Sequence, residues 1–138
     1  MSRIINPESA GKERTRLTRA VVLAVRELAH QTEPGAESRD LAAFIALALR
    51  IVADTIDVSV IAWEKRGYWV KADRFRMEWM WAGQLADKMR KAVLAEDWGT
   101  VALAAAQTAQ KLGKINVPVN HRLGTPWVGA YAELKQQS

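Results

Sequence analysis

The sequence contains no cysteine, and this absence excludes several kinds of site at once. Disulfide bonds, thiolate metal ligands and a cysteine nucleophile all require that residue. Because proteins of the reducing cytoplasm do not depend on disulfides, we expect a cytoplasmic location. Residues 1–10 also lack the apolar run of a signal peptide, since they contain Asn6, Pro7 and Glu8.

Long apolar runs are missing as well. The longest, residues 41–49, is about half the length of a membrane-spanning helix, so we expect no contact with a membrane. With only four prolines and eight glycines, the composition excludes a collagen-like chain, and 49% hydrophobic with 25% charged residues indicates a folded, soluble protein. The length of 138 residues predicts one domain over residues 1–138.

Apolar periodicity predicts an all-α fold: an antiparallel four-helix bundle followed by an irregular C-terminal segment that ends in a short helix. The expected helices cover residues 7–31, 39–66, 69–95, 98–112 and 126–134. Asn6 and Asp97 are expected to cap the first and fourth helices, and Thr125-Pro126 to begin the last. Gly67 is expected to end the second in a left-handed conformation.

The third expected helix has the clearest pattern. Six apolar residues recur at intervals of four and three: Phe75, Trp79, Ala82, Ala86, Met89 and Val93. Three more apolar residues widen this stripe: Met77, Trp81 and Leu85. Residues 56–60 leave an alternative open, because they alternate with period two and are rich in β-branched side chains, as in a strand. We favour the helix, since no turn residue separates them from the apolar run before.

Two residue pairs could support metal or acid–base chemistry. Glu27 and His30 have the Glu-x-x-His spacing of di-metal bundles, but that chemistry needs a second such pair, and the only other histidine is His121. Asp54 and Asp57, one helical turn apart, could act as an acid and base pair. They also lie on a polar stripe with Arg50, where an Arg50–Asp54 ion pair is possible. We therefore predict no catalytic residue, metal site or cofactor, and no enzymatic activity.

Positive charge gathers near the two ends of the chain. The net charge is +5; residues 1–32 contain six basic and three acidic residues, and residues 99–138 contain four and one. Within the first helix a basic row follows one line, interrupted by Leu23: Lys12, Arg16, Arg19, Arg26 and His30. Such a row could follow a nucleic-acid backbone, although Glu8, Glu13 and Glu27 on the same helix also fit an ordinary solvated face.

Tryptophan supplies six of the ten aromatic residues. We expect Trp79 and Trp81 in the core and Trp98 and Trp127 as anchors of the last segments. The candidate partner contacts are the aromatic residues around the second turn and two residues of the 120–124 loop: Trp63, Tyr68, Trp69, His121 and Arg122.

These patterns lead to a ranked expectation of function. The first is a non-enzymatic intracellular interaction or scaffold protein that forms a homo-oligomer, because residues 41–53 are apolar nearly all round and residues 100–110 carry no charge. The second is a nucleic-acid-binding protein that uses the basic row and the C-terminal segment. The third is a metal-binding or catalytic bundle.

Overall fold

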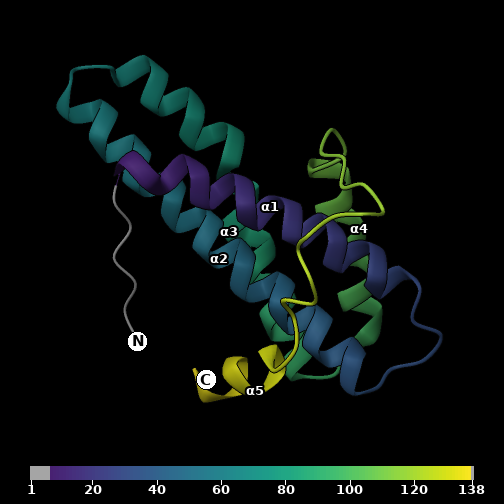
Figure 1. Ribbon diagram of the computed structural model, residues 1–138. Coiled ribbons are helices and arrows are strands. Elements are labelled where there is room, and N and C mark those ends of the chain that lie inside the picture. The colour runs from purple at the N-terminus through teal and green to yellow at the C-terminus, as the bar shows by residue number, and fades with distance from the viewer. Residues whose placement is uncertain (1–6, 138) are drawn as a thin grey trace.

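A computed structural model describes residues 7–137, which form five helices and no strand (Figure 1). They are α1 (Pro7–Ala29), α2 (Ala36–Lys65), α3 (Trp69–Leu94), α4 (Trp98–Lys111) and α5 (Ala130–Gln136). The prediction of an all-α fold is confirmed. Residues 56–60 lie within α2, so the strand alternative is wrong. Ile56 and Val60, one turn apart, are both buried with Ala72 of α3, which explains why helical packing prevails there.

The four longer helices contact one another in the order expected of an antiparallel bundle. The central helix α2 packs against both α1 and α3, α4 packs against α3 and α1, and α5 packs against α2. Most of the buried residues form one cluster shared by these helices. Among residues 7–137, no helix is both long enough and apolar enough to cross a membrane.

The end of the α2–α3 hairpin projects beyond the start of α1, so neither α1 nor α4 covers it (Figure 1). A small second cluster holds this end together: Ile56, Val60 and Ala72 are buried there, and Phe75 packs against them. The reversal depends on Gly67, whose φ of +81° is the left-handed conformation predicted for this position. The amide of Tyr68 donates to the carbonyl of Trp63 at 2.9 Å and closes the turn.

The predicted helix ends agree to within three residues for the first four helices, as expected where helices fray. Asp97 caps α4 as predicted, since its Oδ1 accepts a hydrogen bond from the amide of Thr100 at 3.2 Å. The predicted cap at Asn6 lies outside the described residues.

The start of the last helix was predicted wrongly. Residues 126–129 form a turn, and α5 begins at Ala130. The two carboxylate oxygens of Asp40, on α2, accept hydrogen bonds from the amides of Gly129 at 3.1 Å and Tyr131 at 2.9 Å. A side chain 89 residues away in sequence therefore supplies the cap that Thr125 was expected to supply.

The tryptophans predicted to be structural are largely so. Trp127 is buried, and Trp98 is half-buried against the main cluster. Trp79 and Trp81 are also half-buried, and their rings stack with centroids 5.5 Å apart. Met77 was wrongly assigned to the core stripe, because its side chain is 67% exposed.

Candidate contact surfaces

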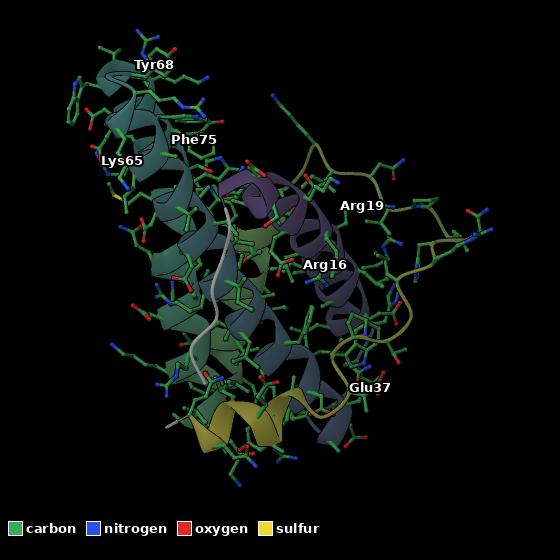
Figure 2. All side chains as sticks on the ribbon, turned by 60° about the vertical axis from the view of Figure 1, so that its left-hand side comes forward. Arg16, Arg19, Glu37, Lys65, Tyr68 and Phe75 are labelled. Carbon is green, nitrogen blue, oxygen red and sulfur yellow. The ribbon has the colours of Figure 1, made fainter. Side chains whose placement is uncertain are left out.

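The predicted basic row on α1 is not one continuous surface. Lys12 and Arg16 are exposed and Arg19, at the middle of the helix, is half-buried. Figure 2 shows Arg16 and Arg19 on α1. Further along, Arg26 is held by the protein, because its Nη2 donates to the carbonyl oxygen of Val117 at 2.8 Å. His30 is exposed just beyond the end of α1. The structure therefore separates the first three cations from the last two residues of the predicted row.

The interruption of the row at Leu23 has a structural cause. Leu23 lies between Arg19 and Arg26 on the helix, yet it is only 2% exposed and belongs to the main buried cluster. We attribute its burial to the C-terminal segment, which the Arg26–Val117 hydrogen bond holds against α1 one turn further along. Leu23 therefore belongs to the packed interior and not to an exposed basic face.

The C-terminal segment between α4 and α5 carries cations and no carboxylate. From Gly99 to Ala132 the sequence contains no Asp or Glu. Val117 is buried, and Ile115 and Leu123 pack against the main cluster. The side chains of Lys114 and Arg122, each next to one of these apolar residues, are exposed. The segment is thus anchored by its apolar residues and presents its cations to solvent.

The aromatic corner predicted at the α2–α3 turn divides into an inward and an outward part. Trp63 is half-buried, and its ring makes an edge contact with the ring of Phe75, with the two centroids 4.9 Å apart. The Nζ of Lys71 lies 4.5 Å from the centroid of the Trp63 ring. Tyr68 and Trp69 are 54% and 63% exposed at the end of the hairpin. Figure 2 shows Tyr68 at that end and Phe75 nearer to α1. Only the outward pair is available to a partner.

His121 and Arg122, the other predicted contacts, lie in the C-terminal segment, away from the hairpin end (Figure 1). The Nδ1 of His121 accepts a hydrogen bond from the amide of Leu123 at 3.1 Å, so this imidazole shapes a local turn. Arg122 is exposed. The structure does not bring the five predicted partner contacts together.

An exposed apolar surface on α3 was missed by the sequence analysis. Trp69, Val70, Met77 and Met80 are between 52% and 67% exposed, and their spacing places them along one side of the helix. We call these four residues the α3 apolar row. The sequence does contain a signal for this row, because large apolar residues occur on two sides of the third helix. Phe75 and Trp79 lie on the packed side, so the apolar residues on the other side have no packing role there.

A second arrangement missed by sequence joins α1 to the base of the projecting hairpin. Arg14 donates from Nε to Thr55 Oγ1 at 3.2 Å and from Nη2 to Ser59 Oγ at 3.0 Å. Its guanidinium also lies 4.8 Å from the ring centroid of Phe75. Burial lowers the pKa of Arg14, although an arginine remains charged at any physiological pH. This arginine holds structure together and is not available to a ligand.

The residues considered for acid–base or metal chemistry do not form a shared site. Burial raises the pKa of Asp54, and nearby Arg50 opposes that shift. The predicted Arg50–Asp54 pair is replaced by a longer-range one, because Arg50 Nη2 lies 2.9 Å from Asp87 Oδ1 and also donates to the carbonyl of Gly83. Within residues 7–137, no three His, Asp or Glu side chains are placed to hold a metal ion.

The two surfaces used to predict self-association differ in the structure. Between residues 41 and 53 of α2 the apolar side chains are buried or half-buried, so its apolar girth is used inside the fold. On α4, Ala102, Leu103 and Ala106 remain exposed. An apolar groove of about 420 Å³ lies between α1, the following loop and α4, with Leu28 and Trp98 in its lining.

No protein-family model, curated protein or solved structure matches this chain.

Proposed function

We propose that this protein is a non-enzymatic, intracellular interaction module that self-associates through the α3 apolar row. The observation that carries this proposal is the exposure of four large apolar side chains along one helix. Exposed apolar side chains gathered on one side of a helix mark interaction sites, and here they form two groups, Trp69 with Val70 and Met77 with Met80, on either side of the exposed Asp73. Methionine and tryptophan are also enriched where proteins meet, because they contribute large apolar contact area.

The position of the row supports the same function. It lies on the projecting α2–α3 hairpin, where the other helices leave it uncovered (Figure 1). A second copy can therefore approach without displacing any part of the fold. A symmetric dimer needs a surface that matches itself, and an apolar helix side paired antiparallel with its own copy meets that requirement.

The hairpin is also ordered in advance, which lowers the entropic cost of association. Arg76 on α3 joins Glu64 of α2 at 3.1 Å and Asp73 of its own helix at 2.9 Å. Trp63 and Phe75 pack between the two helices, and Arg14 ties α1 to the hairpin. These contacts hold α3, and with it the α3 apolar row, in a fixed position before a partner binds.

Sedimentation velocity at tens of micromolar tests the proposal. We expect the wild type to be a dimer or higher oligomer, and the double variant Met77→Glu/Met80→Glu to be a monomer. Each methionine buried in an interface contributes about 1.5–3 kcal/mol, and added carboxylates repel across a symmetric contact, so the dissociation constant should rise at least about 100-fold.

A matched control is Val119→Glu/Val128→Glu, which replaces two exposed apolar residues outside α3 with the same two charges. It should self-associate like the wild type. A monomeric wild type contradicts the proposal. Dissociation by Leu103→Glu on α4, with the α3 variant still oligomeric, would place the interface on α4 and contradict it equally.

A further inference from the structure

We propose that α1 and the C-terminal segment together form a binding face for the phosphate backbone of a nucleic acid, recognised without regard to base sequence. This face is separate from the α3 apolar row. Its five cations come from two distant parts of the sequence: Lys12, Arg16 and Arg19 from α1, and Lys114 and Arg122 from the C-terminal segment. We call them the five-cation face.

The fold brings the C-terminal segment against the second half of α1, beyond the three cations of that helix. The C-terminal segment is bonded to α1 through Arg26 and Val117, about two helical turns beyond Arg19. Earlier along the segment, Leu112 lines a small cavity with Val22 and Val25 of the same helix. The segment therefore meets α1 between Val22 and Arg26 and crosses it on the way to α5 (Figure 1). Its exposed cations, Lys114 and Arg122, flank Val117, the residue through which the segment is bonded to α1.

The local charge balance favours an anionic partner. In the described part of the chain, Lys12, Arg19, Lys114 and Arg122 form no ion pair. Arg16 is paired with Glu13 at 3.1 Å, yet its side chain remains 56% exposed. The absence of any carboxylate between residues 99 and 132 leaves the cations of the segment uncompensated within it. Repeated phosphates along a strand match such a spread of single charges.

Backbone recognition without base readout fits the residues present. The face consists of flexible Lys and Arg side chains, which contact phosphates as charges. Binding should therefore depend steeply on salt concentration. If all five cations displace condensed counterions, the slope of log K against log salt should approach about −4.5 for duplex DNA and about −3.5 for a single strand.

The test is fluorescence anisotropy with two labelled probes, a mixed-sequence single-stranded RNA and a duplex DNA of the same length. Each is titrated at several NaCl concentrations between about 50 and 200 mM, the range over which phosphate contacts weaken most visibly. The key variant is Arg19→Glu/Arg122→Glu, with one change in each part of the face. We expect its affinity to fall at least about 10-fold and its salt slope to become shallower by about 2.

The matched control is Lys91→Glu/Lys135→Glu, which changes the net charge equally on α3 and α5, outside the proposed face. A milder pair, Lys12→Gln/Lys114→Gln, removes two charges without adding carboxylates and should also flatten the slope. Circular dichroism melting checks that each variant is folded.

Weaker binding by Arg19→Glu/Arg122→Glu and a shallower salt slope in both variants of the face, with the control unchanged, support the proposal, and the probe that binds more tightly identifies the strand form. Three results would overturn it: no binding of either probe at the lowest salt, affinity that does not change with salt, or equal weakening by the control.

Discussion

Arg14 of α1 donates a hydrogen bond from Nε to the hydroxyl oxygen of Thr55 on α2, 3.2 Å away. Thr55 is fully buried, and its own hydroxyl donates to the carbonyl of Val52 at 2.6 Å. The guanidinium thus contributes a hydrogen bond to a buried hydroxyl group of α2. This link fixes the beginning of α1 against the projecting hairpin, so both proposed surfaces depend on it for their relative position.

Replacement of Arg14 by alanine should destabilise the fold measurably. Removing a charged donor from part-buried hydrogen bonds, together with its contact to Phe75, should lower the free energy of unfolding by about 2 kcal/mol. Urea denaturation followed by tryptophan fluorescence measures this change. Lys12→Ala, on the exposed side of the same helix, should change stability by less than about 0.5 kcal/mol. Equal effects of the two substitutions would show that the Arg14 contacts contribute nothing.

Asp40 should control the docking of α5. Asp40→Ala leaves the amides of Gly129 and Tyr131 without their acceptor, and loss of such a cap costs about 1 kcal/mol. We expect faster hydrogen–deuterium exchange over residues 129–137, with exchange in α3 unchanged, because the effect is local. Glu37→Ala, one turn earlier on α2 and exposed, is the matched control. Slow exchange at α5 in the Asp40 variant would contradict the capping role.

The Asp97 cap should make stability depend on pH in acid. Hydrogen bonds from Thr100 lower the pKa of Asp97 below its ordinary value. A carboxylate with a lowered pKa in the folded state stabilises that state above its unfolded pKa, and this contribution is lost as the pH falls through the folded pKa. Asp97→Asn keeps an acceptor oxygen but does not titrate.

The comparison to make is the melting temperature of wild type and Asp97→Asn from neutral pH down to about pH 3, because the contribution of a carboxylate with a lowered pKa begins to fade near the unfolded pKa of Asp, about 3.9. We expect the wild type to be the more stable at neutral pH and the difference to shrink in acid. Asp97→Ala should melt lower than both at neutral pH. A difference that stays constant over the whole range would mean that the charge of Asp97 does not contribute.

Most of the helices could be predicted from sequence because their signals are local. Phe75, Trp79, Ala82 and Ala86 recur at helical spacing, and the structure buries or half-buries each of them. Gly67 and Asp97 act on backbone groups within a few residues, so their roles were also readable in advance. The start of α5 was not, because its cap comes from Asp40 on another helix.

The candidate surfaces were predicted less well, for the same reason. The sequence pattern predicted that Met77 widens the apolar stripe that includes Phe75, but its side chain lies on another side of α3 and is 67% exposed. Leu23 interrupts the basic row in the sequence, and in the structure it is buried in the main cluster. Periodicity shows which side of a helix is apolar, but it does not show whether another part of the chain covers that side.

The sequence alone determined the helical class of this protein, the approximate bounds of its four long helices and the lack of thiol chemistry, because each follows from composition or from contacts between near neighbours. Tertiary structure decided which apolar residues stay exposed and which cations share a face. Those outcomes depend on contacts such as the one between Arg26 and Val117, which are 91 residues apart. Only the folded chain brings such residues together, since their approach is set by the packing of the whole core.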